Sequence, residues 1–177
     1  LIWGVITDTM QLEEGTSVDL SRFIHPRIEP EVAFITRKEI SSALNLAEAI
    51  DAIAGVCPAM EIIDSRYQAF KFTLEDVVAD NTSSAGFVLG AMRPVNTDIS
   101  NCGVNMKENG RLVQAGSTAA ILGDPLRCLV QVSQLLAEKG QVLPAGSIIM
   151  AGAATAAQAM QKNALYETNI LGLGTVS

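Results

Sequence analysis

The pattern of apolar and polar positions along the chain predicts a protein built mainly from β-strands. Runs rich in β-branched, aromatic and other apolar residues are typical of strands. Such runs occur at residues 3–10, 31–36, 55–64, 87–95 and 143–152, and a last strand or strand pair is expected within 164–177. Pro94 is expected to break the fourth run, because proline cannot donate a hydrogen bond to a sheet.

A tight hairpin is predicted over residues 103–117. Asn109 and Gly110 stand at its centre, and both residue types adopt the positive φ angles that a two-residue turn requires. The hairpin adds two further strands to the predicted set.

Two stretches have helical spacing. Residues 45–53 place Leu46, Ile50 and Ile53 on one stripe. Residues 123–140 begin with a capping Asp124 and end at Gly140. The expected buried stripe of this second helix consists of Leu129, Val132, Leu135 and Leu136. One long and one shorter helix among many strands, without regular alternation of strands and helices, predict an α+β fold.

Composition narrows the class of function. The chain has 177 residues, 49% of them hydrophobic, which suffices for one domain with a buried core. No apolar run approaches the roughly 20 residues of a membrane span. A net charge of −7 argues against binding to nucleic acid and fits recruitment of metal cations. Three widely spaced cysteines (Cys57, Cys102 and Cys128) predict neither a zinc site nor a disulfide framework, and favour a reduced, cytoplasmic compartment.

Three carboxylates stand out in apolar surroundings. Glu29 and Glu31 are two residues apart, so on a strand they share a face. Glu61 lies inside another apolar run, where an unpaired carboxylate is costly. Oxygen ligands from two strands suit Mg²⁺ or Mn²⁺. The alternative is that Glu29 and Glu31 lie on a solvated edge, and that Glu61 pairs with Arg66 or Arg27.

Other polar residues cluster just beyond these strands. Arg66, Asn81, Ser83 and Ser84 could serve a pocket, or they could form turns and caps through backbone hydrogen bonds. Lys71 lies between aromatic residues, where it could hold a substrate carboxylate or keep its ammonium group in water. A single histidine, His25, makes a nucleophilic Ser/His or Cys/His system improbable, and a structural role is expected for it.

The order of several segments resembles the hydratase/decarboxylase family of the fumarylacetoacetate hydrolase superfamily. These segments are PRIEPEVAF, PAMEIIDSRY, ADNTSSAGFVLG, GDPLRCLVQVSQLLAEKG, LPAGSIIMAG and GLGTVS. The family includes 2-hydroxypentadienoate hydratases and 4-oxalocrotonate decarboxylases, and IDSRYQAFKF is similar to the decarboxylase branch. The resemblance implies a strand-rich mixed β-sandwich or roll. Pro30 departs from the alanine that is usual in the family.

The resemblance also implies a site and a reaction. Glu29, Glu31 and Glu61 would bind Mg²⁺ or Mn²⁺. The metal would hold 2-oxo-3-hexenedioate by its C1 carboxylate and C2 carbonyl, and decarboxylation would give 2-hydroxypenta-2,4-dienoate and CO₂. Lys71 and Ser83 are candidate catalytic residues. Ser84, Asn81 and Arg66 are candidate substrate-binding residues.

Several further expectations follow from the same resemblance. The resemblance implies that the principal catalytic lysine lies before the first residue of this chain. Residues 1–177 would then be one catalytic domain lacking an N-terminal segment. A homo-oligomer is expected, and a complex with the partner hydratase is plausible. Two alternatives remain: a hydratase acting on 2-hydroxypenta-2,4-dienoate, and a non-catalytic partner subunit with the same fold.

Overall fold

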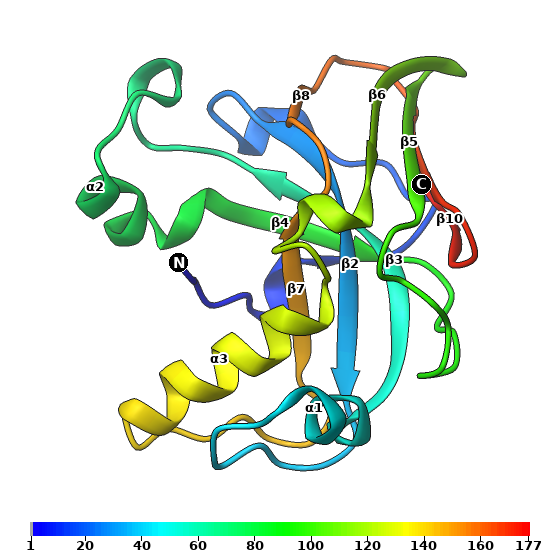
Figure 1. Ribbon diagram of the computed structural model, residues 1–177. Coiled ribbons are helices and arrows are strands. Elements are labelled where there is room, and N and C mark those ends of the chain that lie inside the picture. The colour runs from blue at the N-terminus through cyan, green and yellow to red at the C-terminus, as the bar shows by residue number, and fades with distance from the viewer. Residues whose placement is uncertain (1) are drawn as a thin grey trace.

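The computed structural model describes residues 2–177. Within this range it contains ten β-strands and three α-helices, the strand-rich α+β arrangement that was predicted (Figure 1). The strands are β1 (Gln11–Leu12), β2 (Arg27–Thr36), β3 (Ile53–Ile63), β4 (Ser84–Leu89), β5 (Gly103–Glu108), β6 (Arg111–Ser117), β7 (Ile148–Ala153), β8 (Gln158–Ala159), β9 (Tyr166–Ile170) and β10 (Gly174–Val176). The helices are α1 (Leu46–Ala52), α2 (Leu74–Ala79) and α3 (Leu126–Glu138). None of the helices in this range is long and apolar enough to cross a bilayer.

The strands form two sheets. The larger sheet has the order β1-β4-β3-β2-β7, and β8 also pairs with β2. The smaller sheet has the order β10-β9-β5-β6. Residues Ile28, Met60 and Ile62 from one face of the large sheet pack in one core with Met106 and Tyr166 of the small sheet. The two sheets therefore enclose a sandwich-like core.

A second core joins the helices to the large sheet. Phe34, Val56 and Ile149 of that sheet pack in one cluster with Leu129 of α3 and Ala49 of α1. In Figure 1 helix α3, in yellow, runs beside β7 at the lower left of the sheet. Helices α1 and α3 thus cover the end of the sheet that lies away from β8 (Figure 1).

Helix α3 has the ends that its sequence predicted. The Asp124 carboxylate accepts a hydrogen bond from the Leu126 N–H at 2.9 Å. Gly140 has φ +63°, and the next N–H, from Gln141, donates to the Leu136 carbonyl at 2.9 Å. This pairing across a left-handed residue is a common helix stop. The buried face consists of Leu129, Ser133 and Leu136, whereas the predicted Val132 and Leu135 are only half-buried.

The predicted hairpin over 103–117 is confirmed as β5–β6. Asn109 and Gly110 have φ values of +51° and +78° and form its turn. The predicted strands at 31–36, 55–64 and 143–152 are also found, as β2, β3 and β7, and the last pair is β9–β10. Strand β2 begins earlier than predicted, at Arg27.

Four predictions about local structure were wrong or incomplete. Residues 3–10 form no strand and end in a 3₁₀ turn at Asp8–Met10. Strand β4 ends at Leu89, well before Pro94: the Gly90 N–H still donates to the Pro58 carbonyl of β3, but proline has no N–H to donate in return. Helix α2 was not predicted, although Thr73 and Asp76 form a capping box at its start.

The fourth error concerns helix α1. Leu46 and Ile50 are 46% and 39% exposed, and the buried residues are Ala49 and Ala52. This seven-residue helix packs against α3, and its alanine face permits a close approach that the leucine and isoleucine side chains would prevent. Ile53 is buried, but it belongs to β3.

Candidate metal centre

Glu29, Glu31 and Glu61 lie together on one face of the large sheet. Glu29 and Glu61 are direct partners in the antiparallel β2–β3 ladder, and Glu31 follows two residues along the same face. One carboxylate oxygen from each residue lies within 4.8 Å of the other two. Glu31 is 1% exposed and Glu61 is 8% exposed, so the solvated-edge alternative is excluded. Their role as metal ligands remains a prediction.

Two hydrogen bonds from distant segments orient these carboxylates. The Ser84 hydroxyl, at the start of β4, donates to Glu61 Oε1 at 2.5 Å. The Gly152 N–H, in β7, donates to Glu31 Oε2 at 2.8 Å. The register between β2 and β7 shifts at this point, and Gly152 has φ +106°. The irregularity accounts for an N–H that points at a side chain and not at the ladder.

Pro30 lies in the middle of the sheet, not at the edge where a strand usually tolerates proline. On the side of β7 and β8, however, the ladder is interrupted between Ile28 and Glu31. The Pro30 carbonyl still accepts a hydrogen bond from the Ala154 N–H at 2.8 Å. The missing proline N–H therefore falls where the ladder is already interrupted.

The site favours protons or a cation. Burial raises the pKa of Glu29 to about 7, and the charge of Glu61 adds to this effect. Burial also raises the pKa of Glu31 well above its ordinary value, as do the neighbouring charges of Glu61 and Glu29. Burial raises the pKa of Glu61, although the hydrogen bond from Ser84 opposes the shift.

The donor set fits a hard divalent cation. No ion pair within residues 2–177 involves any of the three glutamates, so neither Arg66 nor Arg27 neutralises Glu61. Burial, and then the charge of Glu31, raise the pKa of the Cys128 thiol to about 12, so this nearby sulfur stays protonated. Three buried carboxylates without a protein cation match the oxygen ligands that Mg²⁺ and Mn²⁺ prefer.

Ser83 and Arg66 are engaged by Asp80, a residue 2% exposed. The Asp80 carboxylate accepts hydrogen bonds from the hydroxyls of Ser83 and Ser65 at 3.1 and 3.2 Å, from the Arg66 N–H at 3.0 Å, and from the Arg66 guanidinium. Burial alone would raise the pKa of Asp80, but these hydrogen bonds hold it below its ordinary value. This cluster braces the loop between β3 and α2 against the end of α2.

Asn81 holds the first segment of the chain. Its side-chain amide donates to the Val5 carbonyl at 2.9 Å and its Oδ1 accepts the Val5 N–H at 2.7 Å. A Cβ on Gly4 would lie 2.7 Å from the Asn81 carbonyl, so only glycine permits this approach. Asn81, Thr82 and Ser83 all have φ between +51° and +61°. Such a run of left-handed residues is strained and requires support from its surroundings.

Lys71, the last of the predicted site residues, is exposed. Within residues 2–177 its side chain has no hydrogen bond or ion pair, and its backbone N–H donates to the Gln68 carbonyl at 3.1 Å. Sequence reasoning did not anticipate Gly152 as a hydrogen-bond donor. A glycine inside a predicted strand was the available signal, since such glycines often mark bulges.

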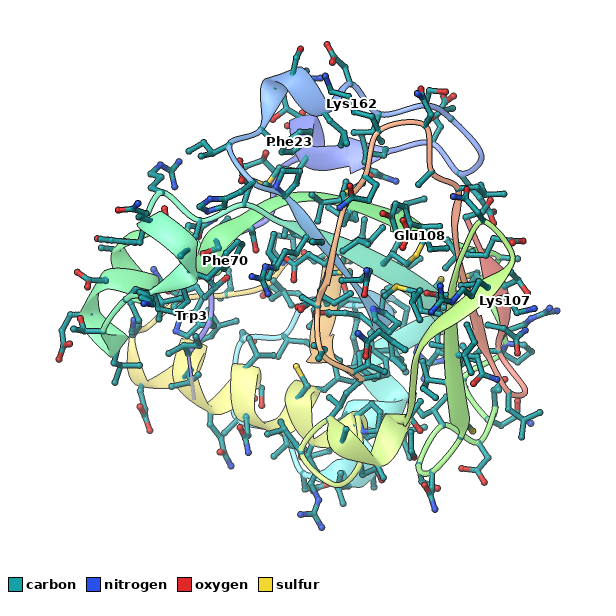
Figure 2. All side chains as sticks on the ribbon, turned by 90° about the horizontal axis from the view of Figure 1, so that it is seen from above. Trp3, Phe23, Phe70, Lys107, Glu108 and Lys162 are labelled. Carbon is teal, nitrogen blue, oxygen red and sulfur yellow. The ribbon has the colours of Figure 1, made fainter. Side chains whose placement is uncertain are left out.

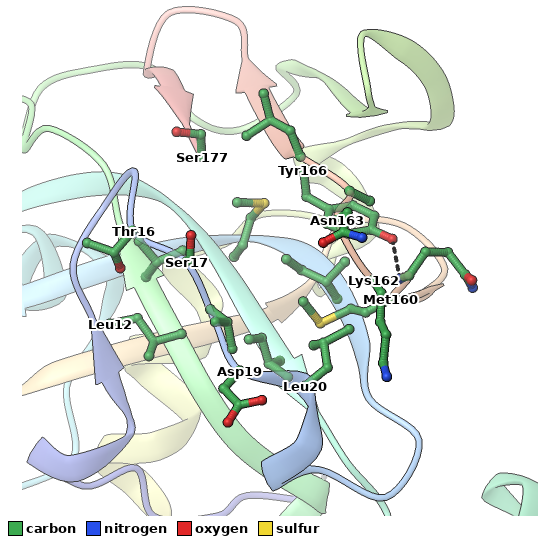
Figure 3. A pocket seen from close by; sticks show the side chains of 18 of the residues that line it. Leu12, Thr16, Ser17, Asp19, Leu20, Met160, Lys162, Asn163, Tyr166 and Ser177 are labelled. Atoms are coloured by element: carbon green, nitrogen blue, oxygen red, sulfur yellow. Dashed lines mark hydrogen bonds between the residues drawn. The ribbon is translucent and has the colours of Figure 1, made fainter.

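A cavity lies on the other side of the sheet. Its volume is about 580 Å³, and its lining includes the apolar residues Ile28, Met60, Ile62 and Val88. Ser17, Asp19 and Lys162 also line it (Figure 3). Ile28 and Met60 alternate along their strands with Glu29 and Glu61, so they point to the opposite face. The cavity is therefore separated from the carboxylates by the sheet itself.

Comparisons with known proteins identify relatives of the whole chain. Residues 8–177 match the family model described as fumarylacetoacetate (FAA) hydrolase C-terminal. A 4-oxalocrotonate decarboxylase of Pseudomonas sp is 49% identical over 177 residues, which are 100% of this chain and 69% of the relative. 2-Keto-4-pentenoate hydratase 2 of Dechloromonas aromatica (strain RCB) is 33% identical to this chain. That match covers 99% of this chain and 68% of the hydratase.

A solved structure supports the same relationship. The 4-oxalocrotonate decarboxylase from Pseudomonas putida G7, complexed with magnesium and adipate, superposes with a TM-score of 0.93 at 40% identity. The match covers 98% of this chain and 67% of that chain.

Proposed function

The chain belongs to the fumarylacetoacetate hydrolase family, and on that premise we propose that it catalyses the metal-dependent decarboxylation of 2-oxo-3-hexenedioate. The products are 2-hydroxypenta-2,4-dienoate and CO₂, and the enzyme is a carboxy-lyase. The observation that carries the proposal is the buried cluster of Glu29, Glu31 and Glu61, which has no cationic partner within residues 2–177. The 49% identity to a decarboxylase, against 33% to a hydratase, favours this reaction over hydration.

The three glutamates would hold Mg²⁺ or Mn²⁺. When bound, the cation supplies Lewis acidity that stabilises negative charge on the C2 carbonyl oxygen of the substrate. Ser84 keeps Glu61 in place and the Gly152 N–H keeps Glu31 in place, so the ligand set is preorganised. Both donors belong to strands of the large sheet, Ser84 to β4 and Gly152 to β7.

The reaction breaks the bond between C5 and C6. Its electron pair moves through C4 and C3 toward the C2 oxygen, CO₂ leaves, and a proton from solvent or an acidic group completes the dienol. The same face of the sheet carries Ala33, Cys57 and Ala59, all buried. Apolar neighbours limit the water near the reacting carbons. Lys71 and Ser83 remain proposals for proton transfer.

We further propose that the chain works as a homo-oligomer and associates with the hydratase that consumes its product. Transfer of the reactive dienol between two such sites would limit its loss to solvent. A reducing, cytoplasmic setting is consistent with Cys57, Cys102 and Cys128, none of which is in a disulfide.

The test is CO₂ release from 2-oxo-3-hexenedioate. The protein is treated with a chelator, then supplied with Mg²⁺ or Mn²⁺, and compared with Glu61→Gln. Glu13→Gln, an exposed glutamate remote in sequence from the cluster, is the matched control. Turnover that returns with metal in the wild type and the control, but not in Glu61→Gln, supports the proposal. Metal binding without CO₂ release, together with hydration of 2-hydroxypenta-2,4-dienoate, would favour the hydratase instead.

A further inference from the structure

We propose that Arg27 binds the second carboxylate of the substrate and so selects a dicarboxylate. The inference rests on the proposed function, because it assumes that the first carboxylate and the C2 carbonyl lie at the glutamates.

Arg27 extends the row of ligands along β2. Arg27, Glu29 and Glu31 alternate with Ile28 and Pro30, and side chains two residues apart on a strand share a face. Neighbouring positions in this row are about 7 Å apart along the strand. A positive charge therefore follows directly on two negative ones, on the face where substrate would meet the metal.

The guanidinium of Arg27 is held by an aromatic ring. It lies over the Phe70 ring, 4.5 Å from the centroid. The same ring packs on His25, with 4.8 Å between centroids. Phe70 and its neighbour Ala69 both have left-handed backbones, with φ of +54° and +55°. A strained turn that presents one ring to an arginine indicates a side chain fixed for recognition.

Arg27 has no anionic partner of its own. No ion pair or side-chain hydrogen bond to its guanidinium occurs within residues 2–177. It lines a cavity of about 380 Å³ together with His25 and Phe70, at the β8 end of β2, and none of the three glutamates lines this cavity. The Nε2 atom of His25 is also buried without a hydrogen-bond partner in the described part of the chain. The cavity thus offers unsatisfied cationic and polar groups to an anion.

The chemistry of the substrate matches this arrangement. A six-carbon 2-oxo-dicarboxylate held at C1 and C2 places its C6 carboxylate at the far end of an extended chain. The planar guanidinium can bind a carboxylate with two parallel hydrogen bonds. Arg66 is unsuited to this role because it pairs with Asp80. The ion pair with Arg27 exists in the bound substrate and weakens as the carboxylate becomes neutral CO₂. Removing Arg27 should therefore affect KM more than kcat.

Binding of a substrate-like pair of probes tests the inference. Adipate carries a carboxylate at both ends, whereas hexanoate carries one. Titration calorimetry of the Mg²⁺-loaded protein should show that Arg27→Gln lowers the affinity for adipate by about 10- to 100-fold. This is the range expected for the loss of a hydrogen bond to a charged group. Hexanoate and Mg²⁺ itself should bind as in the wild type, within about twofold.

Two further variants make the result specific. Lys107→Gln removes the same charge from β5, on the opposite side of the molecule from Phe70 (Figure 2), and should bind adipate normally. Arg27→Lys keeps the positive charge but cannot donate two parallel hydrogen bonds to a carboxylate, so it should recover part of the affinity for adipate. Unchanged adipate binding by Arg27→Gln, or equal loss of adipate and hexanoate, would overturn the inference alone. A wild-type protein that binds Mg²⁺ but not adipate would also overturn the inference, whereas failure to release CO₂ from 2-oxo-3-hexenedioate would overturn the proposed function.

Discussion

Glu29 and Glu61 face each other as direct partners across two antiparallel strands. Like charges in this position destabilise a sheet, and here burial makes the repulsion stronger. The sheet can hold both residues only if a proton or a cation lies between them. The cluster therefore has opposite effects on the metal-free and the metal-bound protein.

Glu29→Gln should separate these two effects. Removing one charge should weaken Mg²⁺ binding by at least about 100-fold, since even residues that only support metal ligands change affinity by 10- to 100-fold. The same change should stabilise the metal-free protein at alkaline pH, because the remaining carboxylates repel each other less. Calorimetric titration and urea unfolding in a chelator measure the two quantities. A variant that binds Mg²⁺ normally would contradict the assignment of Glu29 as a ligand.

The metal-free protein should become less stable as pH rises. Folding raises the pKa of Glu29 from 4.5 to about 7, so between these values the folded state holds a proton that the unfolded state releases. The stabilising contribution is complete below pH 4.5 and is lost as pH rises through about 7. The shift corresponds to about 3 kcal/mol. Thermal unfolding in a chelator at about pH 5.5 and about pH 8 measures the change.

Magnesium should reverse this dependence. Because protons and the cation compete for the same oxygens, Mg²⁺ binds more tightly at the higher pH and restores the stability lost there. A melting temperature that rises with pH in the chelator would show that the cluster stays ionised without a cation.

Ser84→Ala should weaken Mg²⁺ binding by about 10- to 100-fold, through loss of the hydrogen bond to Glu61. Ser84→Thr keeps the hydroxyl and should recover most of the affinity. If Ser84 instead contacts only the substrate, Ser84→Ala will leave Mg²⁺ binding unchanged and alter KM alone. Titration of each variant with Mg²⁺ in the absence of substrate distinguishes the two roles.

Asp80→Ala should be far more destabilising than Arg66→Ala. Asp80 is buried and receives several hydrogen bonds, so its loss leaves buried donors without an acceptor and should cost about 3 kcal/mol. The Arg66 side chain is 73% exposed, and exposed ion pairs contribute about 1 kcal/mol or less. Urea unfolding of both variants makes the comparison. If both variants lose the same free energy of unfolding, the ion pair between Asp80 and Arg66 is the main contribution of Asp80 to stability.

Asn81→Ala should loosen residues 2–7 without changing Mg²⁺ affinity. The side chain makes both of its hydrogen bonds to Val5, each with a net contribution of about 1 kcal/mol. Hydrogen exchange at the Val5 amide should become faster. Normal exchange together with a raised KM would instead support the substrate-binding role that the sequence suggested.

Local patterns in the sequence identified most of the fold. The caps of α3 and the Asn109-Gly110 turn act over a few residues, and both were predicted. Strand β2 and the shared face of Glu29 and Glu31 follow from a period of two residues. Helix α1 was placed correctly but its buried face was not, because close packing against α3 selects alanine over larger apolar residues.

The supports of the metal centre could not be predicted in the same way. Ser84 reaches Glu61 from 23 residues away, and Gly152 reaches Glu31 from 121 residues away. Neither contact has a local signature. Arg27 was considered only as a partner for Glu61, and its placement over Phe70 depends on a left-handed turn that no residue type in the segment indicates.

The hydrogen bond from Gly152 to Glu31 also bears on how the protein folds. Contacts between segments so far apart form late, because a long loop must close before they contribute. A nascent chain that has not yet formed β7 would have the three glutamates but not the geometry that orients them. Capture of Mg²⁺ during refolding should therefore lag behind the formation of the β5–β6 hairpin, and would serve as a kinetic reporter of the completed sheet.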